Sequence, residues 1–170
     1  ECGNGVADEE FAVSAQTGTS AASVVVRIST TSTASDAEWK SWGVQDVRVF
    51  VAIGPPSAPP PALPPLAPGW TLVAHDAWPG ATDWSSNQPL NVTTCGALGL
   101  MLGGYNVFGL GAYAEKTFDL SGAPAHSLVR VEMRFFKIDS WDNEDAMVHL
   151  VGNLAWSRPN HAAGTQLGGR

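Results

Sequence analysis

The sequence predicts an all-β protein built as a β-sandwich or jelly roll. Stretches of alternating apolar and polar residues recur along the chain, and short runs rich in Gly, Pro and Ser separate them. No stretch carries the apolar stripe of an amphipathic helix. Apolar residues make up 44% of the 170 residues, which is enough for one domain with a substantial core.

The N-terminal third contains clear strand signals. Residues 11–31 alternate and are rich in β-branched residues, and "SVVVRIST" (residues 23–30) is the strongest strand among them. The sequence "VQDVRVFVAI" (residues 44–53) alternates apolar and polar side chains and predicts a second strand. The Ser- and Thr-rich stretch between them is typical of a polar loop.

A proline-rich stretch follows at once. Residues 54–70, "GPPSAPPPALPPLAPGW", carry eight of the twelve prolines in the chain. Proline cannot donate to a β-ladder, so strand pairing must stop here. As polyproline II, the fourteen residues 55–68 would span about 43 Å at about 3.1 Å per residue. The chain therefore divides into residues 1–54, a linker of residues 55–69, and residues 70–170.

Beyond the linker, the pattern predicts further strands. They are expected within residues 69–78, 114–120, 127–138 and 146–156, with short, sharply bent strands in the glycine-rich residues 97–113. Residues 79–96 are predicted to form a loop, and the tail from Ser157 has no pattern. The clearest strand is 127–138, where one side carries Leu128, Arg130, Glu132, Arg134 and Phe136, and the other Val129, Val131, Met133 and Phe135.

Composition narrows the class of partner and the compartment. The net charge is −7 and no basic patch exists, so nucleic acid and anionic membranes are poor partners. No apolar run approaches the roughly 20 residues of a membrane helix, so we expect no membrane insertion. The chain begins without Met or a signal peptide, which indicates a processed chain or a fragment. Few charges and many small hydroxyl residues favour an extracellular or cell-surface location.

Two cysteines, Cys2 and Cys95, are present. An even count in a chain of low charge favours one disulfide in an oxidising compartment. The alternative is a pair of buried free thiols.

An acidic stretch offers candidate calcium ligands. The sequence "KIDSWDNED" brings together the side-chain oxygens of Asp139, Asp142, Asn143 and Glu144. Calcium takes six to eight oxygen ligands, usually from closely spaced carboxylates and carbonyls. The spacing is not that of an EF-hand. The alternative is a solvated acidic turn in which Trp141 alone is buried.

Seven tryptophans are a high number for this length. Trp70, Trp78 and Trp84 lie near predicted loops and are candidates for stacking on sugar rings. The others are flanked by strands and are expected to anchor the core: Trp39, Trp42, Trp141 and Trp156.

Catalytic patterns are missing from the sequence. It has no Gly-x-Ser-x-Gly motif, its four histidines are scattered without zinc spacing, and its glycine-rich stretch lacks the Lys-Ser/Thr of a phosphate loop. We therefore expect that the protein is not an enzyme.

Four motifs stand out beyond the linker: Cys95-Gly96, "LGGY" at residues 102–105, "PAH" at 124–126 and "KIDSWDNE" at 137–144. Together they resemble a repeated β-rich module of large secreted or surface proteins of ciliates and green algae. The back half of such a module, with Cys-Gly and a closing Glu-Ser-Trp-Gly, resembles residues 1–53 of this chain. Here Glu38 is separated from "SWG" by two residues. The resemblance implies an extracellular β-sandwich without catalytic activity.

The order of the two halves is inverted relative to the module. Residues 70–170 resemble its front and residues 1–53 its back. Two arrangements follow: a permuted single domain, or half-domains of neighbouring subunits that complete each other head-to-tail. The resemblance also implies that Cys2 and Cys95 pair, either within one subunit or between neighbouring subunits.

Stiff proline segments in green-algal wall proteins carry sugars on hydroxyproline. By resemblance, glycans are expected on Pro55, Pro56, Pro59, Pro60, Pro61, Pro64, Pro65 and Pro68; a bare spacer is the alternative. Asn91-Val92-Thr93 is an N-glycosylation sequon in a predicted loop.

The leading hypothesis is a structural subunit of an extracellular, glycosylated filament that assembles with itself head-to-tail. The alternative is a calcium-dependent carbohydrate-binding or adhesion module. A plain spacer domain of a larger surface protein is a third interpretation.

Overall fold

The computed structural model describes residues 2, 8–31, 40–53, 69–109, 111–139, 141 and 144–158. Within them the chain forms strands and one short 3₁₀ helix: β1 (Glu9–Gly18), β2 (Ser23–Thr30), β3 (Lys40–Ala52), β4 (Thr71–Asp76), β5 (Ser85–Ser86), β6 (Val92–Thr94), η1 (Gly96–Leu98), β7 (Leu100–Gly104), β8 (Tyr113–Asp119), β9 (Leu128–Asp139), β10 (Ala146–Leu150) and β11 (Asn153–Arg158).

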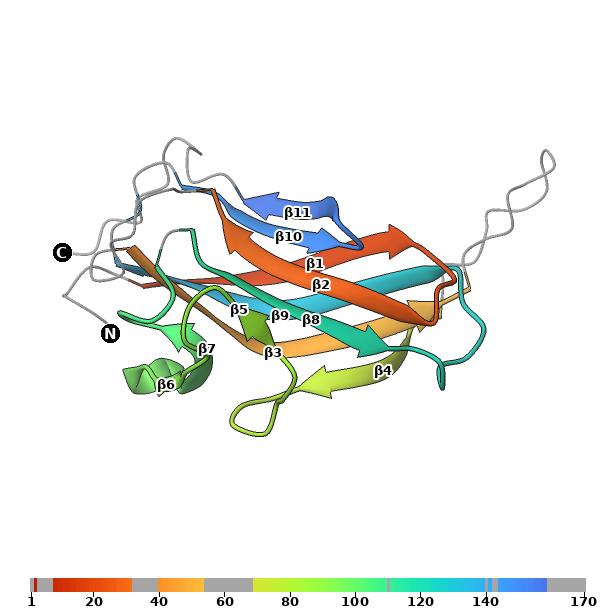
Figure 1. The fold of residues 1–170 in the computed structure, drawn as a ribbon, viewed down its shortest axis with the longest axis horizontal. Helices are drawn as coiled ribbons and strands as arrows, with labels where there is room; N and C mark the ends of the chain where they lie inside the picture. Colours follow the sequence, from red (N-terminus) through yellow and green to blue (C-terminus); the bar gives the residue numbers. More distant parts are fainter. Residues whose placement is uncertain are drawn as a thin grey trace.

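Two antiparallel sheets pack face to face (Figure 1). The six-stranded sheet has the order β1-β9-β3-β7-β6, and β4 also pairs with β3. The five-stranded sheet has the order β11-β10-β2-β8-β5. The predicted all-β sandwich is confirmed. The predicted loop at 79–96 nevertheless contains β5 and β6, which are edge strands too short to show a periodic pattern.

The three N-terminal strands are interleaved with strands from beyond the linker. Strand β1 pairs with β9, β2 lies between β10 and β8, and β3 pairs with β9, β4 and β7. In the described part of the chain, no ladder joins any two of β1, β2 and β3. Strands β1, β2 and β3 therefore contribute to both sheets without pairing with one another.

The chain leaves β3 and re-enters at β4, its direct neighbour. Val51 of β3 is the register partner of Thr71 of β4. The proline-rich residues that connect them, including all eight proposed glycosylation sites from Pro55 to Pro68, lie outside the described residues.

Alternation along the strands fills the space between the sheets. The inward residues of β9 are those predicted, Val129, Val131, Met133 and Phe135. The other sheet contributes Val24, Val26 and Ile28 from β2. Such buried β-branched and aromatic side chains contribute about 1.5–3 kcal/mol each relative to exposure.

Two predicted tryptophan anchors occupy one end of this core. The Trp42 ring lies 4.7 Å from that of Phe108 and 5.5 Å from that of Phe135, centroid to centroid. Trp141 meets Phe135 edge-on at 5.9 Å. Each indole is also hydrogen-bonded, since Trp42 Nε1 donates to the Gly109 carbonyl and Trp141 Nε1 to that of Ser41. Both indole N–H groups are thus satisfied despite burial.

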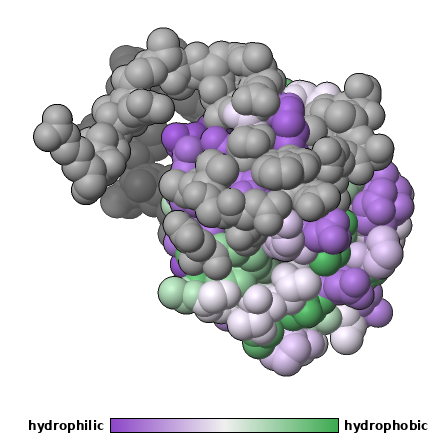
Figure 2. All heavy atoms as spheres, turned by 90° about the vertical axis from the view of Figure 1, so that its left-hand side faces the viewer, coloured by the Kyte–Doolittle hydropathy of each residue, from purple (hydrophilic) through white to green (hydrophobic). Residues whose placement is uncertain are grey.

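A second, smaller core lies on the outer side of the six-stranded sheet. It contains Cys2, Cys95, Met101, Phe136 and Ile138. Phe136 shares a face of β9 with charged residues, and this cluster explains why it is nevertheless buried. Seen from the β6–β7 end, apolar residues gather in the lower part of the molecule (Figure 2).

Candidate functional site

The two cysteines form a disulfide that fastens the start of the chain to the smaller core. The Cα atoms of Cys2 and Cys95 lie 4.8 Å apart, and the bond is made within one chain. It closes a loop across a sequence separation of 93, for which chain entropy predicts a stabilisation of about 4–5 kcal/mol. The bond links the N-terminal segment to the segment beyond the linker.

The predicted calcium ligands are only partly described. Asp139 is fully buried at the end of β9, and Glu144 is nearly so. Lys40 Nζ donates to Glu144 Oε1 at 2.7 Å, and this ammonium balances the charge that a cation would balance. Asp142 and Asn143 lie outside the described residues. No group of three or more His, Cys, Asp or Glu side chains suited to a metal occurs in the described part of the chain.

The candidate stacking tryptophans occupy different environments. Trp84 is only 8% exposed and meets Phe118 edge-on, so it belongs to the core and presents no face to a sugar. Its Nε1 donates to Asp76 at 2.8 Å. Trp78 and Trp70 are half-buried at the surface. This correction leaves Trp70 and Trp78 as candidates, because Trp84 is turned inward between the sheets.

The sequon asparagine is accessible. Asn91 is exposed and directly precedes the edge strand β6. The Thr93 hydroxyl donates to the Gly103 carbonyl at 2.6 Å. Glycosylation of Asn91 stays a prediction that this position permits.

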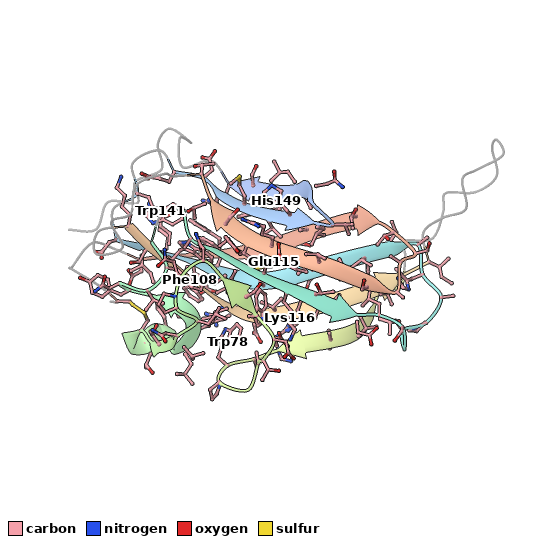
Figure 3. All side chains as sticks on the ribbon, viewed as in Figure 1. Trp78, Phe108, Glu115, Lys116, Trp141 and His149 are labelled. Atoms are coloured by element: carbon pink, nitrogen blue, oxygen red, sulfur yellow. A yellow bond between two sulfur atoms is a disulfide. The ribbon has the colours of Figure 1, made fainter. Side chains whose placement is uncertain are left out.

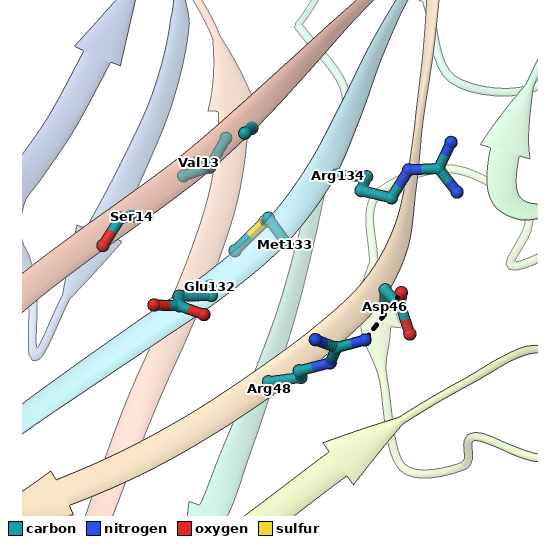
Figure 4. Close-up of a pocket in the computed structure, with 8 residues that line it drawn as sticks. Val13, Ser14, Asp46, Arg48, Glu132, Met133 and Arg134 are labelled. Carbon is teal, nitrogen blue, oxygen red and sulfur yellow. Dashed lines mark hydrogen bonds and ion pairs between the residues drawn. The ribbon is translucent and has the colours of Figure 1, made fainter. Parts of the chain in front are cut away.

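The outer face of the six-stranded sheet holds a groove across three strands (Figure 4). Its volume is about 340 Å³. The side chains that form it come from β1, β9 and β3: Ala12, Ser14, Glu132, Arg134, Asp46 and Arg48. Ser14, Glu132 and Arg48 are register partners in a row across the sheet. The hollow arises because Ala12 and Ser14 are small beside longer neighbours.

A bulge in β3 positions the acidic member of this groove. Between Gln45 and Arg48 the strand has one residue more than β9 opposite, and Asp46 adopts a φ of 59°. At the same point the neighbour of β3 changes from β4 to β7. A second hollow of about 520 Å³ opens there, lined by Asp46 and by Trp78, whose Nε1 donates to the Val44 carbonyl at 2.6 Å.

Ion pairs hold the charged groups of the groove in place. Asp46 accepts hydrogen bonds from His75 Nε2 at 2.8 Å and from Arg48 at 3.0 Å, and these bonds lower the pKa of its carboxyl group. Arg134 makes a bidentate pair with Glu10, which lowers the pKa of Glu10 and raises that of Arg134. The shifted pKa values keep Asp46, Glu10 and Arg134 ionised, and the hydrogen bonds fix the orientation of these three groups.

An apolar row lies beside the groove, toward the end where β3 meets the linker. Phe50 of β3 is the register partner of Arg130 on one side and of Leu72 on the other. The Arg130 guanidinium lies 5.0 Å from the Phe50 ring centroid and 4.4 Å from that of Trp70. Cation–π contacts of this kind keep both rings in defined orientations on the sheet surface.

The sequence did not predict this face as a site. Alternation in 127–138 placed Arg130, Glu132 and Arg134 together on one side of a strand. The residues opposite them on β1 and β3 depend on strand register and on the bulge. Neither the register nor the bulge can be predicted from the composition of the chain or from the spacing of its residues.

In the described residues, no helix is long and apolar enough to cross a membrane. Comparisons of the chain with protein families, curated proteins and solved structures found no match.

Proposed function

We propose that the chain is a structural subunit of an extracellular, glycosylated filament, joined head-to-tail because residues 1–53 of one subunit complete the sandwich of the next. The observation that carries the proposal is the interleaving of the strands. Each ladder of β1, β2 and β3 runs to a strand beyond the linker. The N-terminal segment is thus a donor of three strands, and the same ladders can form within a chain or between chains.

The length of the connection supports exchange between subunits. Val51 and Thr71 are paired neighbours, and such strands are ordinarily joined by two to five residues. Here residues 52–70 intervene and contain eight prolines. As a straight polyproline II segment of about 43 Å, residues 55–68 would be long enough to reach a neighbouring subunit.

Strand exchange between subunits has a low cost in free energy. Every ladder, the core and the disulfide are conserved when the N-terminal segment moves to a neighbour, so only the hinge and the association entropy differ. An open head-to-tail arrangement adds one subunit at each step and does not close. The Cys2–Cys95 bond would then lie between subunits and make the filament covalent.

The remaining parts of the proposal rest on composition. A disulfide is typical of an oxidising, extracellular compartment. Glycans on the prolines and on Asn91 would cover the linker and the β6 edge. We propose the filament and its glycans on the basis of the sequence resemblance together with the strand topology.

The test is the state of the native protein on a gel without reductant, together with electron microscopy. The proposal expects a ladder of disulfide-linked multimers that collapses with reductant, and regular filaments in the images. The matched control replaces residues 54–69 with Asn-Gly, which leaves a short hairpin loop between β3 and β4. This variant is expected to be monomeric with an intrachain Cys2–Cys95 bond.

A native protein that stays monomeric at high concentration, with its disulfide mapped within one chain, would rule out the filament. If the short-loop variant forms multimers of the same sizes and amounts as the native chain, the linker is not what joins the subunits.

A further inference from the structure

The outer face of the six-stranded sheet combines a polar groove with an apolar row. We propose that this face is a binding site for a neutral oligosaccharide, which lies across β1, β9 and β3 and requires no metal ion. The face is built on the β1–β9 and β3–β9 ladders, so the same groove forms whether these ladders are made within one chain or between two subunits.

The groove suits a ligand without charge. Its lining contains two carboxylates, Asp46 and Glu132, and two guanidinium groups, Arg48 and Arg134. Each is paired: Asp46 with Arg48, Glu132 with Arg130 at 3.0 Å, and Arg134 with Glu10. A charged ligand would therefore have to displace a partner that is already in place.

The groove also provides the hydrogen-bond donors and acceptors that a polyhydroxylated ligand needs. Sugar hydroxyl groups both donate and accept hydrogen bonds, so they require donors and acceptors at fixed positions. Ser14, Glu132 and Arg48 provide a hydroxyl, an acceptor and a donor in one row across neighbouring strands about 4.8 Å apart. The ion pairs hold Glu132 and Arg48 in place before the ligand arrives, which lowers the entropic cost of binding.

The apolar row provides a surface for the C–H face of a sugar ring. Phe50 lies two positions from Arg48 on the same side of β3, about 7 Å further along the strand. Leu72 is 50% exposed beside it, and Trp70 is half-buried across the Arg130 guanidinium. One ligand can therefore hydrogen-bond in the groove and pack a ring against the apolar row.

A peptide fits this face less well. A peptide that adds a β-strand would pair along the outer edge of β1 and would not lie across the face over β9, which is paired on both sides with β1 and β3. The second hollow, with Trp78, continues the site beyond Asp46. It offers room for a further sugar residue at the gap between β4 and β7.

The experiment is a titration of the full chain with purified hexasaccharides. Calorimetry measures the affinity, and NMR chemical shifts locate the binding site. The panel contains cellohexaose, mannohexaose, xylohexaose and galactohexaose as neutral probes and hexagalacturonic acid as an acidic probe. We expect at least one neutral probe to bind, with the same affinity in EDTA. Shifts should centre on Ser14, Arg48 and Phe50.

Three variants separate this site from general effects. Arg48→Met and Phe50→Ser are each expected to weaken binding at least tenfold. Arg27→Met is the matched control: Arg27 lies on the outer face of the other sheet, pairs with Glu115, and is as exposed as Arg48, at 43% against 44%. It should leave the affinity unchanged. Circular dichroism of each variant establishes that the fold is retained.

The proposal is overturned if no neutral probe binds, if the acidic probe binds more tightly, or if EDTA abolishes binding. Equal affinities of the native chain and the Arg48→Met variant would likewise overturn it, because the ligand would then lie elsewhere.

Discussion

Val151 is a β-branched residue in the left-handed region of backbone conformation, with a φ of 52°. It occupies the two-residue turn with Gly152 that joins β10 to β11, where Leu150 pairs with Asn153. Turns of this kind require positive φ at both central residues and favour Asn-Gly. A valine at this position raises the conformational energy of the folded state, because its branched side chain crowds the backbone.

Val151→Asn is therefore expected to raise the free energy of unfolding by about 1 kcal/mol. The measurement is urea denaturation followed by circular dichroism. Val92→Asn is the control, since Val92 is also exposed but lies in strand β6 without a positive φ. It should be neutral or destabilising. An equal effect of both substitutions would mean that hydrophilicity, not backbone strain, governs the result.

In the "LGGY" motif, backbone conformation and close packing explain why Gly103 is a glycine. Gly103 has a φ of 82°, and a Cβ there would collide with the Phe108 ring and approach the Trp42 carbonyl to 2.8 Å. The sequence predicted tight bends from these glycines. Only the packed structure identifies the aromatic pair that fills the space.

At the scale of elements, a charged pair closes one side of the sandwich. Lys116 of β8 points inward, and its Nζ donates to Asp76 Oδ2 of β4 at 2.7 Å, so the pair joins the two sheets. Both side chains are 12% exposed. Lys116 and Trp78 lie on this side of the molecule (Figure 3). Trp84 Nε1 donates to the same carboxylate.

Removing one partner of a buried ion pair leaves an uncompensated charge. Lys116→Met is expected to lower the free energy of unfolding by about 2–4 kcal/mol, measured as a shift of the urea midpoint. Arg27→Met on the neighbouring strand removes an exposed pair and should cost less than about 1 kcal/mol. If the two substitutions cost the same, the inward pair contributes no more than a surface pair.

Strand β9 shows how far a periodic pattern can be trusted. Its alternation predicted both faces correctly from Val129 to Phe135, where the inward residues are apolar and the outward residues are charged, whereas Phe136 is apolar and buried in the smaller core. In β3 the pattern is interrupted by the bulge at Asp46. Val44 and Val47 both face the core across it, three residues apart. The extra residue directs Asp46 and Arg48 to the outer face, where they complete the groove.

At the scale of the whole molecule, stability depends on contacts between distant parts of the chain. Strand β9 loses both of its neighbours when residues 8–53 are absent, because these neighbours are β1 and β3. Strand β2 likewise separates β10 from β8. Neither side of the linker can bury its apolar surface alone, and folding must bring together strands far apart in sequence.

Peptides of residues 1–53 and 69–170 are therefore each expected to lack a cooperative unfolding transition. Mixed in equal amounts under oxidising conditions, they should recover the circular dichroism spectrum of the full chain and form the Cys2–Cys95 bond between them. Thermal melts of each peptide and of the mixture are the measurement. A cooperative transition of residues 69–170 alone, near that of the full chain, would contradict this account.

The sequence by itself determined the fold class, most strands and the burial of Trp42 and Trp141 in the core, whereas Trp39 lies outside the described residues. It could do so because burial follows a local period of two residues along a strand. It also predicted the cysteine pair and the boundary at the prolines, which depend on residue identity alone.

Tertiary structure decided which strands are neighbours, where the register slips and which polar groups meet. In the folded protein, Trp84 is buried in the core and Glu144 pairs with Lys40. Tertiary structure also assembled the outer face from residues on β1, β3, β4 and β9. These features depend on cross-strand register, a non-local property, because any residue of one strand can in principle lie opposite any residue of another until the whole sandwich closes.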